Sequence, residues 1–184
     1  KELLVTPGLD ADVLILGPTG IWILECKYLA GKVVYKKGEG WYQIKEFYRE
    51  GGILEVKRLP FDVDLDEQWL REHMNVVETI RRRLPAQAWL IPHIKGGIAF
   101  THPETALEIY PSCRAEWGNI KKWLKTIRDS RPVPQLTPEV QLQVADALIT
   151  FASKIGNESG TKSALDQAYL VHDQIVHQAQ EYVK

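Results

Sequence analysis

Residues 12–27, DVLILGPTGIWILECK, decide how the rest of the chain is arranged. Two short apolar runs flank a Gly-Pro-Thr-Gly turn, and both are rich in leucine, isoleucine and valine, with one tryptophan. Short β-prone runs on either side of a turn predict a β-hairpin. A loop centred on this turn makes Leu16 face Ile21 and makes Asp12 face Glu25.

Side chains alternate between the two faces of a strand, so Asp12, Glu25 and Lys27 are expected on one face, with Asp10 opposite Lys27. Both strands are apolar on both faces, which predicts that other layers cover the sheet on each side. Two partly buried carboxylates about 4 Å apart repel by ~4 kcal/mol at an effective dielectric near 20. Lys27 can neutralise one of the two charges, and a divalent cation can neutralise both. The alternative interpretation is a purely structural ion cluster without a metal.

Composition places the chain among ordinary folded proteins. It has 184 residues, 45% of them hydrophobic and 26% charged, which is enough for one sizeable core. The net charge of −1 gives no global basic field, although a local groove could still bind nucleic acid. Cys26 and Cys113 form no spaced pattern and no apolar run is long enough to span a membrane, so we expect a cytoplasmic protein without membrane contact.

Further along the chain, the sequence predicts an α/β fold with a mixed central sheet, an antiparallel hairpin core and flanking helices. Residues 1–9 are expected to be loop, and turns at 36–40 and 50–52 predict two more hairpins. Further strands are expected at 88–91, 97–100 and 105–109, and helices at 64–84, 119–128, 137–155 and 163–183. We divide the chain into a core at 1–130 and a helical C-terminal extension at 131–184, which could form an oligomer contact.

The expected helix at 119–128 has one apolar side and one basic side. The apolar side consists of Ile120, Trp123, Leu124 and Ile127, and the basic side consists of Lys121, Lys122, Lys125 and Arg128. Lys121, Lys122 and Lys125 are the best candidates for contacts with a nucleic-acid backbone, although a solvated face is the commoner explanation of such a pattern. The histidines have no zinc-ligand spacing, and no glycine-rich phosphate loop or serine nucleophile motif is present.

The hairpin and its surroundings resemble the nuclease-related (NERD) domain of the PD-(D/E)XK nuclease superfamily. Asp12, twelve intervening residues and then Glu25-Cys26-Lys27 match its metal-site motif. The Gly-Pro-x-Gly turn, a glutamine near the start of the next helix (Gln68) and a strand ending in Phe100-Thr101 are also typical of that domain. The resemblance covers about residues 8–128.

This resemblance implies metal-dependent hydrolysis of DNA phosphodiester bonds on a restriction-endonuclease-like fold. Asp12 and Glu25 would hold Mg²⁺ or Mn²⁺ with the Cys26 carbonyl, Lys27 would orient the attacking water or steady the developing charge, and Gln68 would support the geometry. Two features depart from the family. Tyr28 replaces its usual asparagine. The family's first helix, which carries a glutamate, is expected either in a segment upstream of Lys1 or to be missing, which would leave the site incomplete. That second departure keeps open a non-catalytic module that binds nucleic acid or a partner on the same fold.

Overall fold

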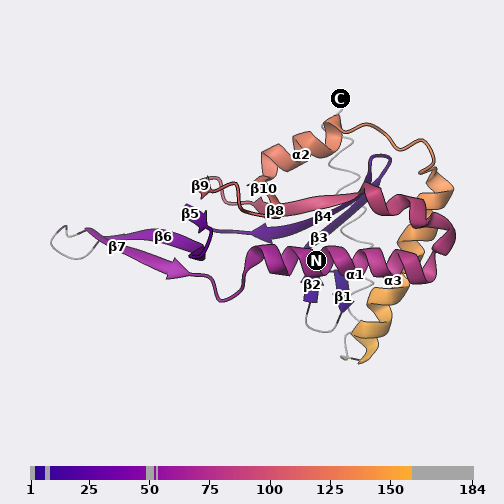
Figure 1. The fold of residues 1–184 in the computed structure, drawn as a ribbon, viewed down its shortest axis with the longest axis horizontal. Coiled ribbons are helices and arrows are strands. Elements are labelled where there is room, and N and C mark those ends of the chain that lie inside the picture. Colours follow the sequence, from indigo (N-terminus) through magenta and orange to yellow (C-terminus); the bar gives the residue numbers. More distant parts are fainter. Residues whose placement is uncertain (1–2, 7–8, 49–51, 53, 159–184) are drawn as a thin grey trace.

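The computed structural model describes residues 3–6, 9–48, 52 and 54–158, and these form a mixed α/β fold (Figure 1). Two four-stranded mixed sheets and one two-stranded ribbon are accompanied by helices. The strands are β1 (Leu3–Thr6), β2 (Leu9–Ala11), β3 (Val13–Gly17), β4 (Gly20–Lys27), β5 (Gly31–Lys36), β6 (Gly40–Tyr48), β7 (Leu54–Pro60), β8 (Ile94–Phe100), β9 (Thr105–Ile109) and β10 (Glu116–Asn119). The helices are α1 (Leu65–Arg83), the 3₁₀-helix η1 (Pro85–His93), α2 (Ile120–Asp129) and α3 (Pro138–Glu158). The predicted fold class is confirmed.

The central sheet has the strand order β10-β8-β4-β3. Strands β3 and β4 form the predicted antiparallel hairpin in the predicted register, with Leu16 paired with Ile21. Strand β8 runs parallel to both β4 and β10, so Lys27, Phe100 and Asn119 form one row across the carboxyl ends of three strands. This edge of the sheet therefore gathers residues from three distant parts of the sequence.

Helices cover both faces of the central sheet, as the doubly apolar hairpin predicts (Figure 1). Ile21 and Ile23 belong to a large core that includes residues of α1 and α3. Trp22 and Leu24 point the other way, into a smaller core with Trp123 of α2. Strand β4 is thus buried between two layers of helix.

Helix α1 begins where the sequence predicts. The Asp64 side chain caps it by accepting hydrogen bonds from the backbone N–H groups of Asp66 and Glu67, at 2.9 and 3.2 Å. The Trp69 indole donates to the Ile23 carbonyl at 3.1 Å and holds the helix against β4. The first half of α1 therefore lies directly over the carboxyl half of β4.

The second sheet has the order β7-β6-β5-β9 and contains both further hairpins that the sequence predicts. The β6–β7 hairpin extends away from the helices as an arm (Figure 1). Phe47 and Tyr48 near its tip are exposed. The two sheets are joined by the short connections from β4 to β5 and from β8 to β9.

Two glycines in β8 let the backbones of the central sheet approach closely. Gly96 has φ +143°, and a Cβ placed there would lie 1.8 Å from the Ile23 carbonyl oxygen. A Cβ on Gly97 would lie 2.0 Å from the Glu116 carbonyl oxygen. No side chain fits at either position without moving a neighbouring strand.

Three local predictions are wrong. Much of the expected loop at 1–9 forms a ribbon of β1 and β2, in which Asp10 pairs with Leu4 rather than with Lys27. The expected strand at 88–91 lies in η1, because prolines at 85 and 92 favour a tight helical turn and interrupt a strand. Leu124 is 57% exposed instead of lying on the buried side of α2.

The residues after α2 pack on the same core as α1. Val133, Leu136, Val144 and Leu148 are buried in the large core, and the Val133 N–H donates to the Pro18 carbonyl at 2.7 Å. Helix α3 continues to Glu158, three residues beyond the expected end, and the expected helix at 163–183 lies outside the described residues. The domain boundary at residue 130 stays a prediction. In the described part of the chain, no helix is both long and apolar enough to cross a membrane.

Candidate active site

Glu25 is fully buried although it carries a carboxyl group. It lies two residues after Ile23 on β4 and so points toward α1, on the face of the large core. Burial raises the pKa of the Glu25 carboxyl, and the charge of Asp12 raises it further, while the neighbouring Lys27 ammonium acts in the opposite direction. The Lys27 ammonium donates a hydrogen bond to Glu25 Oε1.

Glu72 of α1 supplies a second fully buried carboxyl group beside Glu25. The pKa of the Glu72 carboxyl is raised to about 9, mainly by burial and next by the charge of Glu25. The Gln68 side chain, one helical turn earlier, lowers the pKa of Glu72 because its polar amide favours the charged form of the carboxyl group. Burial beside Glu25 therefore favours the protonated form of Glu72 when nothing else compensates the charge of Glu25.

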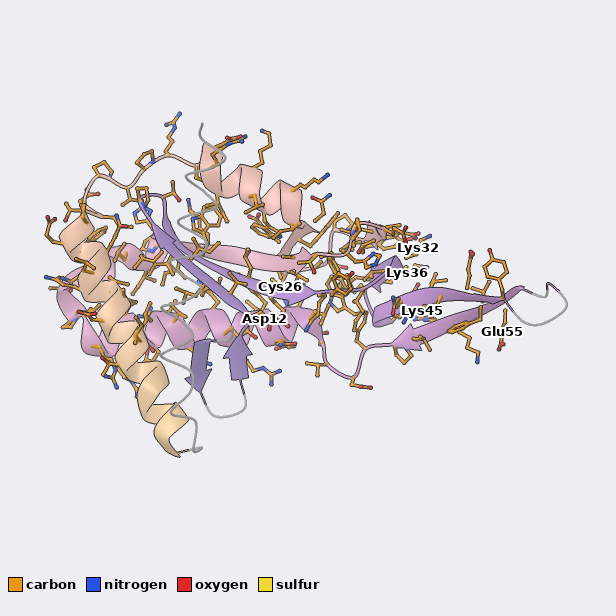
Figure 2. The ribbon with its side chains drawn as sticks, turned by 180° about the vertical axis from the view of Figure 1, so that it is seen from behind. Asp12, Cys26, Lys32, Lys36, Lys45 and Glu55 are labelled. Atoms are coloured by element: carbon orange, nitrogen blue, oxygen red, sulfur yellow. The ribbon has the colours of Figure 1, made fainter. Side chains whose placement is uncertain are left out.

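Asp12 lies at a bend immediately before β3 and closes the cluster from the other strand. Its Oδ2 accepts a hydrogen bond from the backbone N–H of Cys26 at 2.7 Å (Figure 2). Its charge contributes to the raised pKa of both Glu25 and Glu72. The expected meeting of Asp12 with the end of β4 is thus found, through a backbone contact beside Glu25.

The Cys26 side chain points away from this cluster, toward the smaller core under α2. Burial, together with the charges of Asp12 and Glu25, raises the pKa of the Cys26 thiol to about 11. The thiol therefore stays neutral, and only its backbone can serve the site. The role of its carbonyl as a metal ligand stays a prediction.

Four of the sequence-predicted side chains are brought together: Asp12, Glu25, Lys27 and Gln68. The lysines of α2 are not part of this cluster, because α2 packs on the opposite face of the sheet. Lys122 donates to the Trp117 carbonyl at 2.6 Å, and Lys125 pairs with Asp129 at 2.9 Å. Lys121 is exposed.

The donor atoms of the cluster suit a small, hard cation. Glu25 Oε2 and both carboxylate oxygens of Glu72 are buried and have no hydrogen-bond partner among the described residues. Within the same residues, no three His, Cys, Asp or Glu side chains form a ready-made metal site. Mg²⁺ does not require three, since it binds one or two carboxylates and completes its shell with water and phosphate oxygens. Paired carboxylates with unsatisfied oxygens therefore fit this ion.

Sequence reasoning missed Glu72. Residues 65, 69, 72, 76 and 80 follow the apolar stripe of α1 at spacings of three and four, and Glu72 is the charged member of that stripe. A charged residue at a core position, four residues after Gln68, is the signal that could have identified it.

Comparison with known families identifies the segment that holds this cluster. Residues 3–86 match the model of the nuclease-related domain family, NERD. No curated protein and no solved structure shows a significant match. The matched segment contains the β3–β4 hairpin and all of α1, and so includes all five clustered side chains. Over residues 3–86, which hold the whole carboxylate cluster, this chain is therefore similar to the nuclease-related domain family.

Proposed function

We propose that this protein is a nuclease that hydrolyses phosphodiester bonds of DNA with Mg²⁺ or Mn²⁺ as cofactor. The observation that carries the proposal is a pair of fully buried carboxyl groups, Glu25 and Glu72, with three unpartnered oxygens and a lysine beside them. Burial of like charges is costly unless a cation compensates them. The family match supports a nuclease over other uses of such a pair.

Glu25, Glu72 and Asp12 would hold the metal ion, with the Cys26 carbonyl as a further oxygen ligand. The bound metal would supply Lewis-acid polarisation of the phosphate and a water of lowered pKa. Asp12 and Cys26 are joined by the 2.7 Å hydrogen bond, which ties the end of β4 to the start of β3. That bond would fix the spacing between the two strands that contribute ligands.

Lys27 and Gln68 would act beside the metal ligands. The Lys27 side chain is 24% exposed, so its ammonium can reach both the buried Glu25 and a phosphate arriving from solvent. It would orient the attacking water or stabilise negative charge on the phosphate. Gln68 lies next to Glu72 and would keep that carboxyl group in position.

Metal binding tests the proposal most directly. We expect isothermal titration of the chain with MgCl₂ to show binding, and the Glu25→Gln and Glu72→Gln variants to bind at least about 10-fold more weakly. Glu67→Gln is the matched control, because Glu67 is on the same helix but exposed and paired with Arg114. Equal Mg²⁺ affinity in all four proteins would contradict the assignment.

Cleavage of DNA tests the role of Lys27. We expect Lys27→Met to lower the rate of Mg²⁺-dependent cleavage of a labelled DNA oligonucleotide by about 10²-fold or more, because a positioned proton donor or charge typically contributes that much. Lys37→Met, in the exposed turn between β5 and β6, is the control. Unchanged cleavage by purified Lys27→Met would rule out this role.

A second candidate function is a non-catalytic module that binds nucleic acid or a protein partner. The hydrogen bond from Lys27 to Glu25 favours it, because the ammonium already compensates one carboxylate without a metal. This function predicts binding that is indifferent to EDTA and no cleavage after metal addition. The titration and cleavage experiments therefore separate the two functions.

A further inference from the structure

Two aromatic side chains meet just beyond the carboxyl ends of β4 and β8, where the two sheets are joined. Tyr28 follows the last residue of β4, and His102 lies in the connection from β8 to β9. Their ring centroids are 4.8 Å apart at an interplanar angle of 64°, which is an edge-on contact. Tyr28 is nevertheless 74% exposed, so most of its ring surface is open to solvent.

The His102 ring is held in a fixed orientation. Its Nδ1 accepts a hydrogen bond from the backbone N–H of Glu104 at 3.1 Å. The Thr105 hydroxyl lies 2.9 Å from the His102 carbonyl oxygen and 2.6 Å from that of Leu29, and so links the two connections. His102 is therefore a pre-oriented support for the Tyr28 ring.

This aromatic pair, Tyr28 and His102, lies next to the residue proposed to contact phosphate. Tyr28 directly follows Lys27, and the Lys27 carbonyl accepts a hydrogen bond from the Thr101 N–H at 3.0 Å. Neighbouring Cα atoms are about 3.8 Å apart, and successive nucleotides of a DNA strand rise by about 3.4 Å. A phosphate at Lys27 would thus place a base of the same strand within about one or two nucleotides of the Tyr28 ring.

We propose that Tyr28, supported by His102, stacks on an unpaired base next to the phosphate that is cleaved, so that the protein prefers single-stranded or frayed DNA. This inference rests on the proposed nuclease function. An exposed planar ring beside a phosphate site suits an unpaired base, because every base has a π-face, whereas the bases of an intact duplex are stacked on one another.

Equilibrium binding of a 12-nucleotide fluorescein-labelled oligothymidylate, and of a blunt duplex of the same length, tests the inference. Binding is measured in EDTA and again in MgCl₂ with phosphorothioate linkages that slow cleavage. We expect Tyr28→Ala to bind the single strand about 10- to 100-fold more weakly and Tyr28→Phe to bind like wild type, because stacking needs the ring and not the hydroxyl. Binding of the duplex should change less than about 2-fold.

A second variant keeps the test decisive if Tyr28→Ala is unstable. Tyr28→Leu retains apolar volume but has no planar face, so it should resemble Tyr28→Ala in binding while unfolding at the wild-type temperature. A fluorescent 2-aminopurine placed at successive positions of the strand should be quenched at one position by wild type and Tyr28→Phe, but not by Tyr28→Leu.

The outcomes separate this inference from the proposed function. Equal binding by all Tyr28 variants, equal losses for Phe and Ala, equal losses for single strand and duplex, or no binding of the single strand by wild type would each overturn the stacking role. If Mg²⁺-dependent cleavage persists in those cases, only the stacking role is lost. Ring-dependent binding of the single strand without any cleavage would instead remove the nuclease function and keep the stacking site.

Discussion

The two faces of strand β4 are both buried, but one is apolar along its length and the other carries a carboxyl group near its end. On the face toward α2, Trp22 and Leu24 pack against Trp123 in an apolar core that continues to Cys26. On the face toward α1, the apolar residues stop at Ile23, and Glu25 follows with no exposed surface.

This difference shows that the packing of β4 against α2 stabilises the fold, whereas the packing of β4 against α1 buries polar groups at an electrostatic cost. On the face toward α2, the buried Trp123 indole donates to the Ile98 carbonyl at 3.0 Å. On the face toward α1, carboxylate oxygens of Glu25 and Glu72 are buried without partners among the described residues. Buried polar atoms without partners are expected where a ligand completes the site.

The largest expected loss of stability comes from a substitution in the apolar core between β4 and α2. Trp123→Ala should lower the free energy of unfolding by about 3–5 kcal/mol, because it leaves a cavity against Trp22 and Leu24. Leu124→Ala is the control, because the next side chain on the same helix is 57% exposed and its loss should cost less than about 0.5 kcal/mol. Urea unfolding measures both, and similar losses for the two variants would contradict the assignment of α2 to this core.

The next effect concerns the pH dependence of the acidic face. Folding raises the pKa of Glu72 from 4.5 to about 9, so between these values the folded state keeps a proton that the unfolded state has lost. The stabilisation from this proton is complete below about pH 4.5 and is lost as the pH rises toward about 9. Metal-free wild type should therefore lose about 1–3 kcal/mol between pH 6 and pH 8 that Glu72→Gln does not lose.

Urea unfolding of both proteins in EDTA, at several pH values, measures this difference. Glu78→Gln is the control, since Glu78 lies on the same helix but pairs with Arg82 at the surface. Parallel pH profiles for wild type and Glu72→Gln would show that the two buried carboxyl groups are not coupled.

The smallest expected effect concerns how α1 is held over the acidic face. Trp69→Phe removes the indole N–H that donates to the Ile23 carbonyl, and should cost about 1 kcal/mol. Trp41→Phe is the matched comparison, because the Trp41 indole N–H is buried without a partner among the described residues. Trp41→Phe removes ring volume but no hydrogen bond, so it should cost less than Trp69→Phe. Thermal unfolding that ranks the two variants in the opposite order would disprove this account.

The sequence allowed the hairpin and its register to be predicted because turn chemistry and alternation are local. The pairing of Leu16 with Ile21 follows from a four-residue turn, and the burial of both faces follows from the continuous apolar runs. The start of α1 is equally local, and the structure shows a cap there that was not predicted, because the Asp64 side chain satisfies N–H groups two and three residues later.

The parts that could not be predicted depend on tertiary contacts. Residues 88–91 are apolar enough for a strand, but flanking prolines and packing against α1 favour η1. Glu72 becomes a site residue only because α1 lies over the end of β4, and no local rule fixes that placement. The basic residues of α2 were correctly assigned to a helix, but the face of the sheet that this helix covers was not predictable.

The adjacent glycines of β8 have a consequence for how accurately the chain must fold. A slip of one residue between β8 and its neighbours would bring a side chain to a position where backbone atoms of two strands leave no room, so a misaligned sheet cannot close. Gly96 and Gly97 thus select the correct strand register, because a shifted register produces a steric clash. They keep Lys27, Phe100 and Asn119 level with one another, and with them the cluster and the aromatic pair at the same edge.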